Sequence, residues 1–186
     1  MKNNIEISQI LSGYETDKVC GTRYGGDGHC YGEAYDKLFS LFDRSAPLDI
    51  LEVGTQKGGS LLAWKKYFPN SNVTGVDIVD VVLPEYRSDA INYVISDIKQ
   101  YDDSKFYDII IDDGSHYLLD TIYVVKKYTH QLKEGGVLIV EDVQNKDEWE
   151  SALRQLKAKD VTMEVIDMRR VHGNYDDVLI VFKKNK

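Results

Sequence analysis

Residues 108–116 read Asp-Ile-Ile-Ile-Asp-Asp-Gly-Ser-His, and this stretch decides the expected fold. Three isoleucines after Asp108 form a short β-branched run bounded by turn residues, which is typical of a buried strand. Ligands of open parallel sheets bind just beyond the carboxyl ends of the strands. We therefore expect Asp112, Asp113 and His116 to lie at the functional edge of a sheet.

The rest of the chain predicts the sheet around this strand. Apolar runs alternate with segments of helical periodicity, which indicates a doubly wound, Rossmann-like α/β fold. The connection 169–177 is too short for a crossover, so an otherwise parallel seven-stranded sheet should have an antiparallel last strand. The expected strands are 48–53, 72–77, 91–95, 107–112, 137–140, 161–168 and 178–182. The expected helices are 3–12, one from Tyr31, one after Gly54, 118–132 and 146–158.

Length and composition restrict the class of protein. The 186 residues suit one domain, and 23 basic against 31 acidic residues, a net charge of −8, argue against a nucleic-acid or anionic-membrane surface. No apolar run approaches the roughly 20 residues that span a bilayer, and residues 1–11 lack the apolar core of a signal peptide. We therefore expect a cytoplasmic protein in which Cys20 and Cys30 are free thiols. His29 beside Cys30 suggests zinc, but the paired C-x-x-C spacing is missing.

Glycines follow the first expected strand in Glu52-Val53-Gly54-Thr55-Gln56-Lys57-Gly58-Gly59-Ser60. Glycines at this place let a ligand approach the backbone and let the chain turn into a helix. The spacing matches neither the dinucleotide fingerprint G-x-G-x-x-G nor a P-loop, since no G-K-[ST] occurs. The alternative is an ordinary turn between a strand and a helix.

Two further acids follow expected strands. Asp77 ends the second strand, where an acid can accept hydrogen bonds from both hydroxyls of a ribose. Enzymes of NAD and of S-adenosylmethionine (SAM) share this feature, so it does not choose between them. Asp97, after the third strand, either accepts a hydrogen bond from an adenine amino group or caps a helix.

Three acids, Asp113, Glu141 and Asp142, follow the fourth and fifth strands. Neighbouring carboxylates repel unless protons or a cation compensate, and such oxygen ligands suit Mg²⁺, Ca²⁺ or Mn²⁺. The alternative is that Asp113 and Asp142 cap the following segments while Glu141 alone faces the cleft. His116 lies three residues beyond Asp113 and can act there as a general base.

Together these motifs resemble class I SAM-dependent methyltransferases, on residues 51–60, 75–77, 108–116 and 135–142. More narrowly, the chain is similar to the metal-dependent sugar O-methyltransferases of macrolide biosynthesis, which have cephalosporin-hydroxylase-like relatives. The similarity extends to Thr16-Asp17-Lys18 and to residues 31–39. The D-D-G-S-H segment and the E-D pair are fairly specific for this subgroup, whereas the glycine loop indicates only the superfamily.

The resemblance implies roles for individual residues. Mg²⁺, or another hard divalent cation, would be held by Asp113, Glu141 and Asp142, with His116 as the base. Asp112 would face the methionine amino group of SAM. The other cofactor-binding residues would be Gly54, Thr55, Ser60, Asp77 and Asp97, with Thr16, Asp17 and Lys18 in a lid. The whole chain, 1–186, would then be one methyltransferase domain, with 1–46 as N-terminal helices and lid.

The activity implied by the resemblance is transfer of a methyl group from SAM to a hydroxyl of a small-molecule acceptor, a sugar or glycan. The macrolide enzymes are larger, so here the acceptor pocket should come from residues 19–31 and 169–177 or from another subunit of a homo-oligomer. Arg169, Arg170 and His172 either suit an acidic acceptor or form a solvated hairpin tip. The rival readings are an NAD(P)-dependent oxidoreductase and a SAM-binding relative that is hydroxylase-like or non-catalytic.

Overall fold

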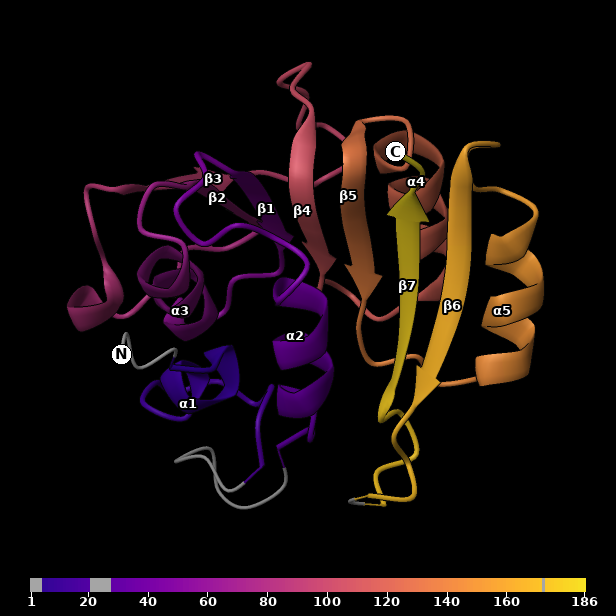
Figure 1. Cartoon of the computed structure of the whole chain (residues 1–186), viewed down its shortest axis with the longest axis horizontal. Helices are drawn as coiled ribbons and strands as arrows, with labels where there is room; N and C mark the ends of the chain where they lie inside the picture. Colours follow the sequence, from indigo (N-terminus) through magenta and orange to yellow (C-terminus); the bar gives the residue numbers. More distant parts are fainter. Residues whose placement is uncertain (1–4, 21–27, 172) are drawn as a thin grey trace.

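A seven-stranded sheet forms the centre of the computed structural model, which describes residues 5–20, 28–171 and 173–186. The strand order within these ranges is β3-β2-β1-β4-β5-β7-β6 (Figure 1). Strand β7 is antiparallel to both neighbours, β5 and β6, while β1 to β5 pair in parallel. The expected fold class is confirmed. The strands are β1 (Asp49–Val53), β2 (Asn72–Asp77), β3 (Ile91–Ile95), β4 (Tyr107–Asp112), β5 (Leu132–Val140), β6 (Val161–Asp167) and β7 (Val178–Lys184).

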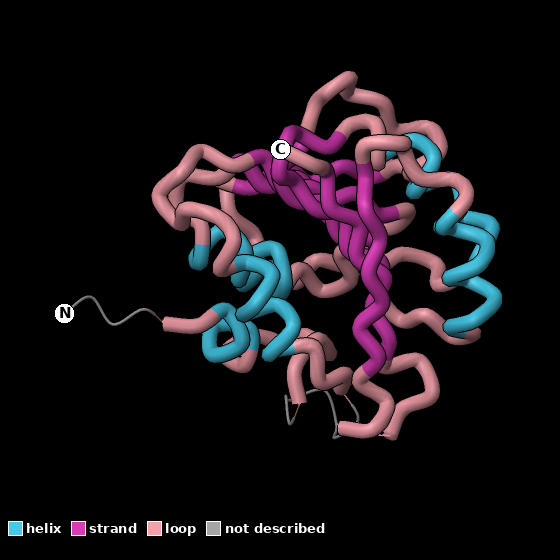
Figure 2. The backbone as a smooth tube through the Cα atoms, turned by 45° about the vertical axis from the view of Figure 1, so that its right-hand side comes forward, coloured by secondary structure: helices cyan, strands magenta, loops and turns pink. Residues whose placement is uncertain are grey.

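Helices cover both faces of the sheet (Figure 2). On one face pack α1 (Ile7–Leu11), α2 (Gly32–Phe39) and α3 (Gly59–Tyr67), and on the other α4 (Leu118–Tyr128) and α5 (Lys146–Arg154). A short 3-10 helix, η1 (Pro84–Tyr86), follows β2. In β4, Ile109 and Ile111 join the first core and Ile110 the second, because successive side chains of a strand point to opposite faces. The central apolar run is therefore buried on both sides.

The fifth strand begins earlier than expected. Helix α4 ends at Tyr128 rather than at Leu132, and β5 starts at Leu132 rather than Val137. The pairing of β4 with β5 shifts register after Tyr107, and Gly135 has φ +75° there. Glycine adopts this conformation without steric cost. The two glycines thus lie inside the strand as an irregularity instead of preceding it.

Several helices are shorter than the sequence patterns predicted. The helices expected over 3–12 and 146–158 are observed as α1 and α5, and the helix from Tyr31 as α2. None of the helices in the described ranges is long and apolar enough to cross a membrane.

A disulfide joins Cys20 to Cys30, so the expectation of free thiols was wrong. The backbone N–H of Tyr31 donates to the carbonyl oxygen of Lys18 (3.0 Å). The segments flanking the two cysteines are therefore hydrogen-bonded to each other, which brings together two thiols ten residues apart. No local sequence pattern encodes this contact.

Candidate active site

A cavity of about 360 Å³ opens beyond the carboxyl ends of β1, β2 and β4. This is the edge at which parallel sheets bind ligands. Most of the predicted site residues line it, namely Thr16, Asp17, Lys18, Gly54, Thr55, Ser60, Asp77, Asp97, Asp112, Asp113 and His116.

The glycine loop after β1 is the point where three segments meet. A Cβ on Gly54, whose φ is +81°, would lie 1.9 Å from the carbonyl oxygen of Asp113. A Cβ on Gly59 would lie 2.6 Å from the carbonyl oxygen of Glu15. Glycine is therefore required for the end of β4 and the N-terminal segment to close around the cavity.

Asp77 and Asp97 stand on the cavity wall, each held by backbone amides. Oδ2 of Asp77 accepts hydrogen bonds from the N–H groups of Thr55 (2.8 Å) and Gln56 (3.1 Å). Oδ1 of Asp97 accepts from the N–H of Lys99 (2.8 Å), which closes a turn rather than a helix. Both carboxylates are thus fixed in orientation beside the cavity.

Asp112 carries a buried oxygen without a donor. Its side chain lines the cavity, and its Oδ2 has no hydrogen-bond partner among the described residues. Burial raises the pKa of this carboxyl to about 7. An unpaired buried carboxylate oxygen costs free energy, so a cationic ligand group placed in the cavity would satisfy it.

Lys18 lies inside the acid cluster, which is formed by Glu52, Asp113, Glu141 and Asp142. Its Nζ is 2.5 Å from Oδ2 of Asp113, 2.9 Å from Oε1 of Glu141 and 3.5 Å from Oε1 of Glu52. Burial by itself lowers the pKa of the ammonium, but these three carboxylates raise it well above its usual value. Lys18 is therefore a buried cation as well as a residue of the cavity wall, whereas the sequence suggested only a lid position.

Two tyrosines at the start of α2 hold the neighbouring acids. The hydroxyl of Tyr35 donates to Oε1 of Glu141. The hydroxyl of Tyr31 donates to Oδ1 of Asp142 (2.6 Å) and accepts from the Asp142 N–H (3.3 Å). The N-terminal segment thus supplies the outer contacts of the acids that follow β5.

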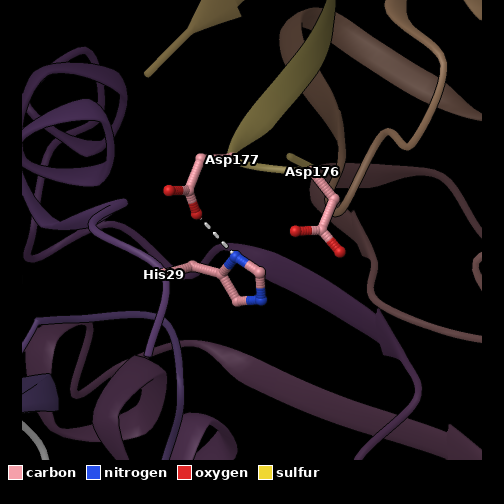
Figure 3. Close-up of side chains that lie close together, drawn as sticks. All are labelled: His29, Asp176 and Asp177. Atoms are coloured by element: carbon pink, nitrogen blue, oxygen red, sulfur yellow. Dashed lines mark hydrogen bonds and ion pairs between the residues drawn. The ribbon is translucent and has the colours of Figure 1, made fainter. Parts of the chain in front are cut away.

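His29 connects this segment to the β6–β7 hairpin. Figure 3 shows its ring facing Asp177, with Nδ1 2.8 Å from Oδ1 of that buried acid. Its Nε2 is 3.5 Å from Oδ1 of Asp142. Burial lowers the pKa of His29, but Asp142 and Asp177 outweigh it, so that the pKa is raised. Ligand atoms of His29, Asp176 and Asp177 lie within 4.8 Å of one another, whereas the disulfide removes both cysteines from any zinc set.

His116 stands between two of the acids. Its Nε2 is 3.9 Å from Oδ1 of Asp113 and its Nδ1 is 3.7 Å from Oδ2 of Asp142. One ligand atom from each of these three residues lies within 4.8 Å of the others. The residues after β4 and β5 therefore converge, and the alternative in which Glu141 alone faces the cleft is not observed.

Comparison with known proteins addresses the family. No family model matches the chain. It is 33% identical over 141 residues to an 8-demethyl-8-alpha-L-rhamnosyl tetracenomycin-C 2'-O-methyltransferase of Streptomyces olivaceus, covering 66% of this chain and 36% of that protein. It is 29% identical over 150 residues to the mycinamicin VI 2''-O-methyltransferase of Micromonospora griseorubida, covering 74% and 36%. The matched part thus spans about a third of these curated relatives.

Solved structures agree on the fold. The MycE methyltransferase of the mycinamycin pathway, in complex with Mg, SAH and mycinamycin VI, superimposes with a TM-score of 0.70 at 21% identity. This match covers 99% of the present chain and 56% of MycE. Together with the curated relatives, this fold places the chain among the class I methyltransferases. The resemblance predicted from the motifs is confirmed.

Sequence reasoning missed several polar residues of this class I methyltransferase site. Glu52 is fully buried, and its Oε2 accepts hydrogen bonds from Ser60 Oγ (3.0 Å) and Trp64 Nε1 (2.8 Å). An acid within an apolar strand was an available signal. Tyr31 and Tyr35, one helical turn apart, read as part of an apolar face. Ser60 lines the cavity as predicted, but its hydroxyl is engaged by Glu52.

At the tip of the β6–β7 hairpin, Arg169 and Arg170 are exposed. Arg169 pairs with Asp167 on its own hairpin (2.6 Å). His172 lies outside the described residues. An open hollow of about 400 Å³ is bordered by Asp167, Arg169, Arg170, Gly173, Asn174 and Tyr175.

Proposed function

We propose that the chain is a SAM-dependent O-methyltransferase that methylates a hydroxyl of a sugar or glycan-like small molecule, assisted by Mg²⁺ or another hard divalent cation. The observation that carries this proposal is one continuous site, in which the cavity with the unpaired Asp112 oxygen adjoins the acids around His116. Relatives named as sugar O-methyltransferases support it, as does the presence of Mg and SAH in MycE.

The chain offers suitable groups for each part of SAM, which supplies an electrophilic methyl group when bound. Asp112 would accept hydrogen bonds from the methionine ammonium through its unpaired Oδ2. Asp77 would accept from the ribose hydroxyls and Asp97 from the adenine amino group. Gly54, Thr55, Ser60 and the segment 16–18 would form the walls around it.

The acid cluster fits a hard cation because its donors are carboxylate oxygens and are in excess of the positive charge within it. Asp113, Glu141 and Asp142 would hold the ion, and an acceptor hydroxyl bound to such an ion has a lowered pKa. His116 lies within 4 Å of two of these acids and would accept the proton from that hydroxyl. Fixing the hydroxyl in one orientation would also align it for an in-line displacement.

The acceptor would enter between the segment that carries His29 and the β6–β7 hairpin, which are joined by the His29–Asp177 contact. We infer a single domain over 1–186 with 1–46 as N-terminal helices and lid, because α1 and α2 share a core with α3 and the sheet. A cytoplasmic location and a homo-oligomer remain predictions.

Calorimetric titration with SAM and with NAD, followed by mass spectrometry of glycoside acceptors, tests the proposal. We expect SAM binding and a mass gain of one methyl group that is lost with EDTA and restored by Mg²⁺. NAD binding without SAM binding would instead indicate an oxidoreductase. SAM binding with no methylated product from any acceptor would indicate a non-catalytic or hydroxylase-like relative.

A further inference from the structure

The N-terminal segment engages one oxygen of each acid after β4 and β5. Lys18 contacts Oδ2 of Asp113 and Oε1 of Glu141, and Tyr31 contacts Oδ1 of Asp142. The atoms that approach His116 are the opposite oxygens, Oδ1 of Asp113 and Oδ2 of Asp142. The outer contacts therefore leave one oxygen of Asp113 and one oxygen of Asp142 facing the space beside His116.

Lys18 differs from Tyr31, which also contacts these acids, because its side chain carries a full positive charge. Its side chain is 1% exposed, and carboxylates of Glu52, Asp113 and Glu141 lie within 3.5 Å of its Nζ. Asp142 adds a fourth carboxylate beside Glu141. When all four acids are ionised, one ammonium leaves an excess of negative charge that a divalent cation can neutralise.

The same lysine joins the acid cluster to the cavity. Its neighbours Thr16 and Asp17 line the cavity wall, and so does Lys18 itself. The carbonyl oxygen of Lys18 accepts a hydrogen bond from the N–H of Tyr31 (3.0 Å), which leads into α2. This backbone hydrogen bond joins the segment before Cys20 to the segment after Cys30 and so fixes the position of Lys18.

We propose that Lys18 is a positioning residue that acts as a resident cation of the acid cluster. It holds Asp113 and Glu141 together before a metal ion arrives, and it competes with that ion for the same two carboxylates. Because like charges repel, Lys18 thereby sets how tightly the cluster binds a divalent cation. This inference rests on the proposed function, since it requires that the cluster binds such a cation.

The first test measures Mg²⁺ binding alone, by calorimetry, to the metal-free full chain. Lys18→Met removes the charge but keeps the apolar stem, and it is expected to bind Mg²⁺ at least about tenfold more tightly than the unaltered chain. Lys18→Arg retains the charge and is expected to bind within about threefold of the unaltered chain.

A matched control comes from the opposite end of the sheet. Lys133 also bridges carboxylates, with Nζ 2.6 Å from Oδ2 of Asp49 and 2.7 Å from Oδ2 of Asp108, but its side chain is 34% exposed, against 1% for Lys18. Neither acid belongs to the cavity lining. Lys133→Met is expected to leave Mg²⁺ affinity unchanged, although it too removes a lysine that bridges carboxylates.

Thermal unfolding keeps the proposal testable if Lys18→Met folds poorly. The variant should unfold at a lower temperature in EDTA, because four carboxylates then face one another without a cation. Added Mg²⁺ should raise its melting temperature by more than it raises that of the unaltered chain. An equal loss with and without Mg²⁺ would indicate a purely structural ion pair and overturn the proposal.

Two other outcomes also decide whether the proposed role of Lys18 holds. Unchanged or weaker Mg²⁺ binding by Lys18→Met, or no Mg²⁺ binding by either protein, would overturn the inference while leaving SAM binding and methyl transfer to be judged separately. Tighter Mg²⁺ binding by Lys18→Met without methyl transfer to any acceptor would sustain the inference and refute the proposed activity.

Discussion

Asp112 and Asp113 are adjacent in the sequence, but their carboxylates serve different parts of the site. The cause is the alternation of side chains at the end of β4. Asp112 lies beside Thr121 of α4, on one face of the sheet, whereas Asp113 contacts Lys18, from the N-terminal segment. The acid proposed to bind the cofactor and the acid proposed to bind the metal ion are thus neighbours in the sequence. Substituting each one alone should separate the two proposed roles.

Replacing Asp113 by asparagine should remove a cation ligand at nearly constant shape. We expect stimulation of methyl transfer by Mg²⁺ to disappear while SAM affinity changes little, as measured by calorimetry and by product formation with and without EDTA. Asp108→Asn, in the same strand but paired with Lys133 at its other end, is the control. Persistence of Mg²⁺-stimulated transfer in Asp113→Asn would refute the metal assignment.

His116→Ala should lower turnover by about 10²- to 10⁴-fold, because the acceptor hydroxyl loses its general base. SAM affinity should stay close to that of the unaltered chain, since the proposed cofactor contacts lie on other side chains. Single-turnover kinetics and calorimetry measure the two quantities, with the exposed His130→Ala as control. A parallel loss of SAM binding would assign His116 a structural role instead.

The ionisation of Asp112 should make both stability and cofactor binding depend on pH. Its pKa is raised to about 7 by burial, against about 4 for an exposed aspartate. The stabilisation from its protonated form is therefore complete below about pH 4 and is lost as pH rises through about 7. Without cofactor, Asp112→Asn should show a smaller fall in melting temperature between pH 5 and 8 than the unaltered chain.

Cofactor affinity of the unaltered chain should rise over the same pH range, since the ionised carboxylate is the form that pairs with an ammonium. Titration of SAM at several pH values checks this. A variant Asp112→Asn that binds SAM as tightly as the unaltered chain at pH 8 would contradict the assigned role.

At the scale of elements, the proposed acceptor side depends on the contact between the N-terminal segment and the β6–β7 hairpin. His29 of the first meets Asp177 of the second, which also accepts hydrogen bonds from the N–H (3.2 Å) and Nδ2 (3.3 Å) of Asn174. The ring of His29 stacks on Tyr31 with centroids 5.1 Å apart. The buried Asp177 therefore stabilises the hairpin and also binds the N-terminal segment, whose Tyr31 and His29 contact Asp142.

Asp177→Asn should loosen this docking without touching the cofactor cavity. We expect a loss of stability of about 1–3 kcal/mol and a raised KM for the acceptor, with SAM affinity unchanged, from denaturant unfolding and steady-state kinetics. Asp167→Asn, which removes a partly exposed partner of Arg169 on the same hairpin, is the control. Equal effects of both substitutions on KM would argue against a specific role of the His29 contact.

At the scale of the whole molecule, the sheet separates two apolar cores, and the N-terminal helices belong to one of them. Ile7, Leu11 and Phe39 are fully buried in the same cluster as Trp64 and Phe68. The N-terminal region therefore completes the fold in addition to lining the cavity.

A chain that begins at residue 47 should not fold cooperatively, because removal of α1 and α2 would expose Trp64 and the sheet face beneath it. Near-ultraviolet circular dichroism and thermal unfolding measure this, with a chain that begins at residue 5 as the folded control. A cooperative transition in the shorter chain would show that residues 1–46 are separable from the domain.

Local patterns in the sequence determined the sheet, its antiparallel last strand and most of the cavity residues. Apolar alternation, glycines and acids after strands are local features, and parallel strands bring their carboxyl ends to one edge. Only the tertiary structure decided the places of Lys18, Tyr31, Tyr35 and His29, each of which binds an acid 95 to 148 residues away in the chain. The tertiary structure also decided the early start of β5 and the disulfide between Cys20 and Cys30. The physical reason is that hydrogen bonds, ion pairs and strand register depend on which distant segments pack together. The periodicity of one segment does not indicate which distant segment will pack against it.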